Sequence, residues 1–284
     1  MNTVLTDLPR ARDYKSDVHP VWCPGCGDFG VLNALTKVFA AEELAPETIA
    51  LISGIGCSSR LPAYINAYGF HGVHGRALPL ATGLAVTRPD LTVIALSGDG
   101  DGFSIGGNHF LHACRRNVDF TWIVMDNAVY GMTKGQASPT TEPDWEGSKL
   151  TPDGTHLDAL QPLEVALAAG CSFIAREFSG NPNGLAQRIA EAIAHPGFAL
   201  IQVISPCITY RPEQMGYKKR IQSGFEVTDQ RGEAYRQLVD AGPLTTGLLY
   251  RLERTQWTPA ERSARSLESL QSAFRVDRED GRDG

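Results

Sequence analysis

The chain has 284 residues, a formal net charge of −6 and a hydrophobic fraction of 42%. This composition predicts a globular protein with a well-formed core. The lysines and arginines are scattered and form no basic stripe, so nucleic acid is not an expected partner. No apolar run approaches the length that spans a bilayer, and none near Met1 resembles a secretory leader. We therefore expect a soluble, cytoplasmic protein without membrane contact.

Short apolar runs alternate with helical patterns along most of the chain. The runs consist of consecutive apolar residues, which predicts strands that are buried on both faces. Such strands belong to a doubly wound parallel sheet with helices on both faces, so we predict the α/β fold class. The expected strands are residues 49–52, 92–96, 120–125, 171–175 and 198–204, and the expected helices are residues 29–43, 76–86, 105–116, 162–169 and 185–195.

Several residues indicate where these elements begin and end. Asp28 is a candidate N-cap of the first helix, Asn117 marks the end of the third, and Pro196-Gly197 mark the end of the last. Residues 131–156 are polar and rich in Thr, Pro and Gly, which favours an active-site loop over a simple connection.

The chain changes character after Tyr210. A short helix is expected near residues 232–241. The pattern over residues 261–274 favours a helix that packs on a partner or lies at the surface, and residues beyond Val276 are expected to be disordered. We therefore divide the chain into a main domain, residues 1–210, and a C-terminal extension, residues 211–284.

A glycine-rich run, Gly98-Asp99-Gly100-Asp101-Gly102, follows one expected strand, and Asp126-Asn127 follows the next. Glycines at such a strand end let the backbone approach an anion, and the following helix can direct N–H groups at a phosphate. Asp99 and Asn127 supply hard oxygen ligands, and Mg2+ needs few of these when diphosphate oxygens complete its shell. The pair predicts a metal and diphosphate site; the alternative is a tight turn that needs glycine for its geometry alone.

Six cysteines without the dense, even spacing of small secreted domains indicate free thiols in a reducing compartment. Cys23 and Cys26 form a CxxC, and Cys57 and Cys207 lie in loops directly after expected strands. Four loop cysteines can bind zinc, bind an iron–sulfur cluster or bind nothing, and their spacing does not decide among these. The remaining cysteines are expected to be small buried hydrophobes: Cys114 and Cys171.

Five motifs follow one another along the chain: WCPGCGD, GIGCSSR, HGRALPLATG, GDGDG and SPCITY. The run GDG with the later Asn resembles the thiamine diphosphate motif of thiamine-dependent enzymes. From Asp13 to about Tyr210, the five motifs together resemble the beta subunit of 2-oxoacid:ferredoxin oxidoreductases. The resemblance implies the diphosphate-binding domain of the thiamine diphosphate-binding fold.

The resemblance also implies a role for each matching residue. The backbone carbonyl of Val129 joins Asp99 and Asn127 as a magnesium ligand. Four cysteines are implied to hold a [4Fe-4S] cluster close to the thiamine: Cys23, Cys26, Cys57 and Cys207. The residues implied to line the thiamine diphosphate are Ile55, Gly56, Cys57, Ser58, His74, Gly75, Arg76, Ala77, Gly100, Asp101, Gly131 and Met132. The alternative is that Gly75 and Gly131 only shape turns and that Arg76 only caps or pairs.

The implied reaction is the coenzyme A-dependent oxidative decarboxylation of a 2-oxoacid, with electrons passed through the cluster to ferredoxin, or its reverse, reductive carboxylation. The segment GMTKGQ at residues 131–136 resembles the members that act on 2-oxoglutarate, so succinyl-CoA is the expected product. Arg60 and Lys134 are the cations expected nearest the pocket, and one of them is a candidate to hold the distal carboxylate. The alternative is two solvated surface cations.

Thiamine enzymes also need a glutamate from a pyrimidine-binding domain, for which this chain is too short. The resemblance therefore implies an alpha subunit that supplies it, in a heterotetramer of two alpha and two beta chains. Within the family, the alternative substrate is pyruvate or a broad range of 2-oxoacids. Outside it, the alternatives are a non-redox thiamine diphosphate decarboxylase or ligase subunit with structural or zinc-binding cysteines, and an electron-transfer subunit without thiamine chemistry.

Overall fold

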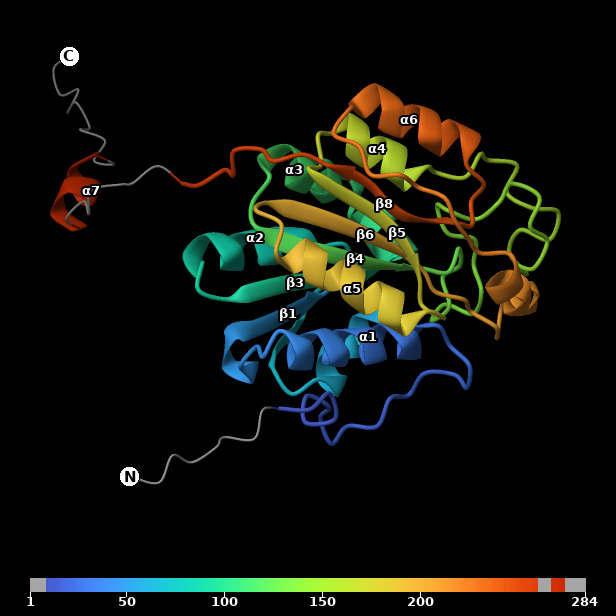
Figure 1. Cartoon of the computed structure of the whole chain (residues 1–284), viewed down its shortest axis with the longest axis horizontal. Helices are drawn as coiled ribbons and strands as arrows, with labels where there is room; N and C mark the ends of the chain where they lie inside the picture. The colour runs from blue at the N-terminus through green and yellow to red at the C-terminus, as the bar shows by residue number, and fades with distance from the viewer. Residues whose placement is uncertain (1–8, 260–266, 274–284) are drawn as a thin grey trace, which may run out of the picture.

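The computed structural model describes residues 9–259 and 267–273 and has an α/β architecture (Figure 1). Within these residues one sheet has the strand order β2-β1-β3-β4-β6-β5-β8-β7. Strands β1 to β6 pair in parallel, whereas β8 runs antiparallel to β5. The strands are β1 (Ile49–Ser53), β2 (Tyr68–His71), β3 (Thr92–Gly98), β4 (Phe120–Asp126), β5 (Phe173–Phe178), β6 (Phe198–Ile204), β7 (Gln222–Ser223) and β8 (Thr245–Arg251).

Helices cover both faces of the sheet. Helices α1 and α5 pack on one face, and α2, α3, α4 and α6 pack on the other. Alternate strand residues enter the two cores, so Ile49 and Leu51 belong to one and Ala50 and Ile52 to the other. This two-sided burial explains the continuous apolar runs and confirms the predicted fold class. The helices are α1 (Asp28–Ala41), α2 (Ala77–Thr87), α3 (Gly107–Arg116), α4 (Pro162–Ala168), α5 (Pro182–Ile193), α6 (Arg231–Asp240) and α7 (Leu267–Ala273).

Hydrophobic periodicity found five strands and missed β2, β7 and β8. Strand β2 has four residues and β7 has two, all of them exposed, so neither forms a buried apolar run that periodicity could detect. Strand β5 begins two residues later than predicted, at Phe173, and continues to Phe178. The start of β5 depends on where it pairs with its neighbours in the sheet. This pairing begins at Phe173, and the neighbouring strands are separate segments of the sequence.

Three predicted helix starts are wrong, including that of the helix predicted from residue 185, which begins at Pro182. Asp28 is not an N-cap: Gly27 occupies that position without a side-chain bond, and the Asp28 carboxylate instead accepts a hydrogen bond of 2.7 Å from Ser205 Oγ. The helix predicted from residue 105 begins at Gly107, because Gly100–Ile105 form a π-helical turn. The predicted end at Asn117 is confirmed, since this residue takes the left-handed conformation with φ of 56°.

The segment after residue 210 contributes to the same sheet and core. Phe225, Ala234, Leu249 and Tyr250 are buried in the cluster that includes α2 and α3. The division at residue 210 stays a prediction, but residues 222–251 are not a separate layer. Of the predicted 261–274 helix, the structure describes Leu267–Ala273 as helical, and the tail beyond 276 lies outside the described residues. Within the described part, no helix is both long and apolar enough to cross a bilayer.

Candidate functional site

Three loops meet at one edge of the sheet, where β1, β3 and β4 end. Together they enclose a small cavity of about 40 Å3. Ligand sites of parallel α/β sheets lie at this edge, beyond the carboxyl ends of the strands. The cavity is lined by Ile55, Gly56, Cys57, Ser58, Gly98, Asp99, Gly100, Asp101, Met125, Asn127, Val129, Tyr130 and Gly131. Most of the residues predicted to contact the cofactor and the metal are therefore neighbours.

Asp101 holds two of these loops together. Its Oδ1 accepts hydrogen bonds from the backbone N–H groups of Ile55 at 3.0 Å and Gly75 at 2.7 Å, and lies 2.7 Å from His74 Nδ1. Its Oδ2 is enclosed and has no partner within the described residues. A Cβ at Gly54 would lie 2.0 Å from that atom, so only glycine fits there. Asp101 thus positions Ile55, His74 and Gly75 around one buried carboxylate.

The other predicted residues lie outside this cavity. Ala77 is buried in the first turn of α2, and Arg76 Nη1 lies 3.5 Å from the carbonyl oxygen of His74, within its own loop. Met132, Arg60 and Lys134 are exposed. The substrate role assigned to Arg60 and Lys134 stays a prediction.

Asp99 is 2% exposed at the end of β3, and its carboxylate has an unusual partner. The Thr140 hydroxyl lies 3.0 Å from Asp99 Oδ2 and 2.8 Å from Asp126 Oδ1. One hydroxyl proton can serve only one of the two carboxylates at a time. Burial and the charge of Asp126 raise the pKa of Asp99 to about 7. A buried carboxylate that has so few hydrogen bonds to offset its charge is suited to binding a cation.

Asn127 and Val129 lie beside Asp99 in the same cavity. Asn127 Oδ1 accepts a hydrogen bond of 3.1 Å from Val129 N–H, and the Asn127 carbonyl accepts one of 2.9 Å from Gln214 Nε2. A carboxylate, an amide oxygen and a backbone carbonyl are donors that a hard divalent cation prefers.

Three residues that were not predicted from the sequence support this site: Thr140, Arg176 and Gln202. Asp126 accepts a hydrogen bond of 2.7 Å from Gln202 Nε2, and Gln202 Oε1 accepts one of 2.8 Å from Arg176 Nε. Strands β4, β6 and β5 contribute one residue each and lie side by side. In the sequence, the only signal for Gln202 and Arg176 is that they are polar residues within apolar strands. Thr140 comes from the polar loop that was predicted to serve the active site.

Hydrogen bonds also join the three segments that carry the predicted cluster cysteines. Trp22 Nε1 donates to the carbonyl oxygen of Cys57 at 2.7 Å, and Gly27 N–H donates to that of Pro206 at 3.0 Å. The CxxC segment is therefore bound both to the loop of Cys57 and to the loop of Cys207. All three segments lie near the carboxyl edge of the sheet.

Three of the four thiols have a raised pKa, and burial is the largest cause in each: Cys26, Cys57 and Cys207. Burial raises the pKa of Cys57 to about 11, and the charges of Cys207 and Cys23 add to the rise. Burial likewise raises the pKa of Cys26, and the charges of Cys57 and Cys207 contribute. Across residues 9–259 and 267–273, no three His, Cys, Asp or Glu side chains surround a point that a single ion could occupy.

The two cysteines predicted to be core residues are buried. Cys114 and Cys171 have no exposed surface and belong to the core cluster beneath α3 and α4. Burial raises the pKa of Cys114 well above its ordinary value, which keeps the thiol protonated and unreactive. These results confirm the prediction for both residues.

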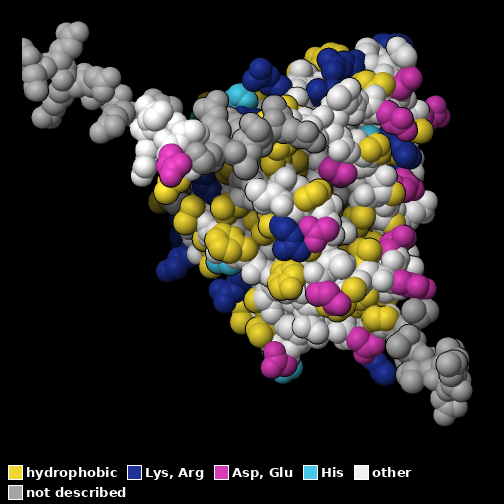
Figure 2. All heavy atoms as spheres, turned by 90° about the vertical axis from the view of Figure 1, so that its left-hand side faces the viewer, with side chains coloured by type: hydrophobic (Ala, Val, Ile, Leu, Met, Phe, Trp, Pro, Cys, Tyr) yellow, Lys and Arg dark blue, Asp and Glu magenta, His cyan; other side chains and the backbone are white. Residues whose placement is uncertain are grey.

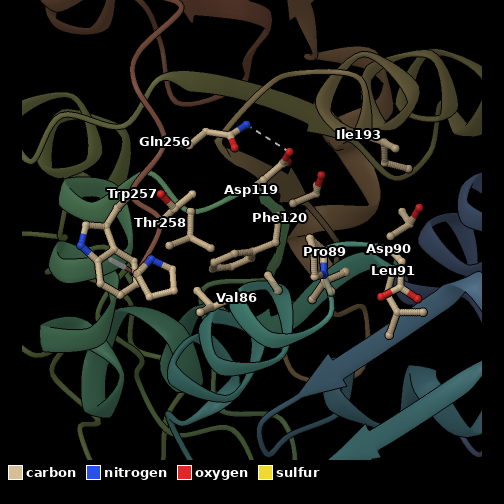
Figure 3. Close-up of a pocket in the computed structure, with 16 residues that line it drawn as sticks. Val86, Pro89, Asp90, Leu91, Asp119, Phe120, Ile193, Gln256, Trp257 and Thr258 are labelled. Carbon is tan, nitrogen blue, oxygen red and sulfur yellow. Dashed lines mark hydrogen bonds between the residues drawn. The ribbon is translucent and has the colours of Figure 1, made fainter. Parts of the chain in front are cut away.

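A second pocket, of about 420 Å3, lies at the opposite edge of the sheet (Figure 3). It is lined by the starts of β3 and β4 and by residues 256–259. Gln256 Nε2 donates a hydrogen bond of 3.2 Å to Asp119 Oδ2 across it (Figure 3). This edge carries the amino ends of the strands, where parallel sheets do not place their active sites. The larger pocket is therefore not the predicted site.

The fold and this arrangement of loops define a class of protein. Residues 54–203 match the family model described as thiamine pyrophosphate enzyme, C-terminal TPP binding domain. The match covers the β1, β3 and β4 loops that form the cavity. The class implied by the GDG motif and Asn127 is thereby confirmed.

Comparison with individual proteins narrows this class. The chain is 45% identical to the 2-oxoglutarate oxidoreductase subunit KorB of Mycobacterium tuberculosis, over 71% of this chain and 54% of that protein. It is 43% identical to the 2-oxoglutarate synthase subunit KorB of Methanocaldococcus jannaschii, over 71% of this chain and 75% of that protein. The chain belongs to the family of 2-oxoacid:ferredoxin oxidoreductase beta subunits. It spans about half the length of the Mycobacterium relative.

A solved structure agrees with the fold along nearly the whole chain. It is the 2-oxoglutarate:ferredoxin oxidoreductase from Magnetococcus marinus with 2-oxoglutarate, coenzyme A and succinyl-CoA bound. The TM-score is 0.84 at 40% sequence identity, and the match covers 89% of each chain. The match covers more of the chain than residues 1–210 contain. It therefore extends well past the predicted domain boundary at residue 210.

Proposed function

We propose that this chain is the beta subunit of a 2-oxoglutarate:ferredoxin oxidoreductase. The reaction converts 2-oxoglutarate and coenzyme A into succinyl-CoA and CO2, and two electrons pass singly to two ferredoxin molecules. One observation carries the proposal: the loop of Cys57 lines the Asp99 cavity and is also hydrogen-bonded to the CxxC segment. A thiamine site and a cysteine cluster would share this loop. The names of the relatives support 2-oxoglutarate as the substrate.

Asp99, Asn127 and the Val129 carbonyl would hold Mg2+, which in turn would hold the diphosphate. Thiamine diphosphate, when bound, supplies a carbanion and a ring that accepts the electrons of decarboxylation. The chain's own residues position it: Asp101 fixes the loops of Ile55 and Gly75 through its three hydrogen bonds. Buried, preorganised groups of this kind cost no reorganisation during the reaction.

Four cysteines would hold a [4Fe-4S] cluster: Cys23, Cys26, Cys57 and Cys207. The cluster, when bound, accepts electrons one at a time. A cubane takes four cysteine ligands, and hydrogen bonds join the three segments that carry these four cysteines. All six cysteines are free, which is consistent with the reducing cytoplasm expected from the sequence.

A partner alpha subunit would supply the pyrimidine-binding domain and its glutamate, in an assembly of two alpha and two beta chains. Hydrophobic side chains gather on the side of the molecule where α2 lies (Figure 2). Tyr68, Phe70 and Leu80 line one shallow surface pocket there and are 58%, 52% and 38% exposed. An apolar patch of this kind suits a subunit contact. Ferredoxin is the proposed external partner.

The proposal is tested by measuring iron, acid-labile sulfide, zinc and thiamine in protein purified without oxygen. We expect about four iron and four sulfide per chain, a loss of both in Cys57→Ala, and retention of both in the matched variant Cys114→Ala. Zinc in place of iron would overturn the redox role in favour of a non-redox decarboxylase or ligase subunit. Iron without thiamine would favour an electron-transfer subunit.

The substrate is tested with the chain assembled with its partner subunit. We expect coenzyme A-dependent ferredoxin reduction with 2-oxoglutarate to exceed that with pyruvate. Lys134→Met and Arg60→Met separate the two candidate cations. A role in holding the distal carboxylate predicts that kcat/KM for 2-oxoglutarate falls at least about tenfold in one of them, with that for pyruvate unchanged. Equal losses for both substrates would contradict that role.

A further inference from the structure

Arg176 is a buried cation whose hydrogen-bonding capacity is mostly unused. It lies in the middle of β5 and is 7% exposed. Its Nε donates to Gln202 Oε1 at 2.8 Å, and its guanidinium carbon lies 5.6 Å from the centre of the Phe225 ring. Its two Nη nitrogens make no hydrogen bond or ion pair with any residue that the structure describes. The four N–H donors on these nitrogens therefore lack a protein acceptor within the described residues, and the nitrogens are not fully enclosed.

The Arg176 side chain lines a cavity of about 580 Å3, a volume typical of small-molecule sites. This cavity is distinct from the cofactor cavity, because the two share only Asn127 among their lining residues. Much of its wall is apolar and comes from the start of α4 and the end of α6. The apolar lining includes Leu160, Leu163, Leu238, Val239, Pro243 and Leu244.

Three carboxylates also line the cavity, and two of them already have partners. Asp126 accepts hydrogen bonds from Gln202 and Thr140, and Glu142 pairs with Arg211 Nη2 at 2.7 Å. Glu164 lies in the first turn of α4. No carboxylate of the described residues lies within 4.0 Å of the Arg176 nitrogens, since no salt bridge joins them. Burial lowers the pKa of Arg176 to about 10, and the charge of Asp126 offsets only part of this effect.

We propose that this cavity, the Arg176 cavity, binds a small aliphatic carboxylate. The carboxylate would accept hydrogen bonds from the unused Nη nitrogens, whose fork matches its two oxygens. The aliphatic chain would pack on the apolar wall from α4 and α6. The site is separate from the cofactor cavity and does not depend on the proposed function. Through Gln202, Asp126 and Thr140, it is also connected to Asp99.

The test is a binding titration of the full-length chain, alone and assembled with its partner subunit. The probe is hexanoate, and the matched compounds are hexan-1-ol and hexylammonium, which keep the chain length without the carboxylate. We expect saturable hexanoate binding that is at least about tenfold tighter than that of either compound. Thiamine diphosphate with Mg2+ should not compete with hexanoate, because the cavities are separate.

Three variants test whether hexanoate binds in the Arg176 cavity. Arg176→Met removes the donors, and Val239→Glu brings a negative charge to the cavity from a residue that is 60% exposed and tolerates change. Each should weaken hexanoate binding at least tenfold, whereas the surface control Arg236→Met should not. If Arg176→Met fails to fold, the hexanoate affinity of Val239→Glu still tests the proposal.

Four results would overturn the proposal. They are equal binding of hexan-1-ol, unchanged binding in Val239→Glu, competition by thiamine diphosphate, and binding by the isolated chain but not by the assembly. The last result would show that the partner subunit fills the cavity.

Discussion

Thr140 shows how a single residue can couple two parts of a site. Its hydroxyl lies within hydrogen-bond distance of Asp99 and Asp126, and it cannot satisfy both while both are ionised. Asp126 is stabilised independently by Gln202. Asp99 is therefore the carboxylate that depends most on a cation.

Asp99→Asn removes this charge and keeps the shape of the side chain. We expect thiamine diphosphate and Mg2+ to bind at least about tenfold more weakly, with no loss of thermal stability in the cofactor-free chain, because a poorly compensated buried carboxylate is gone. Calorimetric titration and thermal unfolding measure the two effects. Asp119→Asn, at the opposite edge of the sheet, is the control. Unchanged cofactor affinity in Asp99→Asn would contradict the assigned metal site.

His195 gives a prediction for the pH dependence of stability. It is 1% exposed, and burial lowers its pKa to about 4. Between pH of about 6.5 and about 4, the unfolded chain binds a proton that the folded chain does not, so this residue makes stability fall as the pH falls through that range. Above this range both states are neutral and the effect disappears.

His195→Gln should therefore flatten the dependence of the unfolding free energy on pH by up to about one proton between pH 4 and 6.5. Urea unfolding at several pH values measures this slope. The exposed His19→Gln is the control and should leave it unchanged. The same slope in His195→Gln as in the natural chain would show that another group causes the acid sensitivity.

At the scale of elements, Asn117 joins four segments. It ends α3, and its Oδ1 accepts from Ser172 Oγ at 2.5 Å and from Phe198 N–H at 3.1 Å, at the starts of β5 and β6. Its Nδ2 donates to the Arg254 carbonyl at 3.3 Å. One buried side chain thus fixes the end of a helix, two strands and the chain after β8.

Asn117→Ala should lower the unfolding free energy by about 2–4 kcal/mol, because it loses buried hydrogen bonds and puts alanine at a positive φ. Asn117→Gly relieves the backbone strain and should cost about 1 kcal/mol less. Denaturant unfolding measures both variants. Glu43→Gly, at an exposed residue with φ of 51°, is the control and should not destabilise. Equal losses in the two Asn117 variants would show that hydrogen bonds alone account for the effect.

At the scale of the molecule, the sheet extends beyond the region that the motifs cover. Strand β8 pairs with β5 and buries Leu249 and Tyr250 against the core. The unpaired edge of β5 would otherwise be exposed, together with Arg176. The last part of the chain is therefore required for the folded core and for the Arg176 cavity.

A chain shortened after residue 210 should be insoluble or unfolded, whereas a chain shortened after residue 259 should keep its melting temperature to within about 3 °C, because both core clusters lie within residues 14–252. Circular dichroism and thermal unfolding compare the two. A stable, monomeric 1–210 fragment would show that the predicted domain boundary is a real one.

The sequence predicted much of this, for identifiable reasons. Strands buried on both faces are apolar throughout, so β1, β3, β4 and β6 were visible as runs. Short exposed strands such as β2 and β7 carry no such signal. The Asp28 cap was predicted from local preference, but the Asp28 carboxylate accepts a hydrogen bond from Ser205, 177 residues away, and does not cap the helix.

By itself, the sequence determined the fold class and the order of the segments that carry glycines, cysteines and metal-binding oxygens, because these depend on composition and spacing along the chain. The family came from the resemblance of its motifs to those of known proteins. Only the tertiary structure decided which polar side chains act together. Thr140, Gln202 and Arg176 lie up to 103 residues from Asp99 in the sequence and meet because β3, β4, β6 and β5 are neighbours in the sheet. Strand order is fixed by packing and by pairing between distant segments, and no local pattern encodes it.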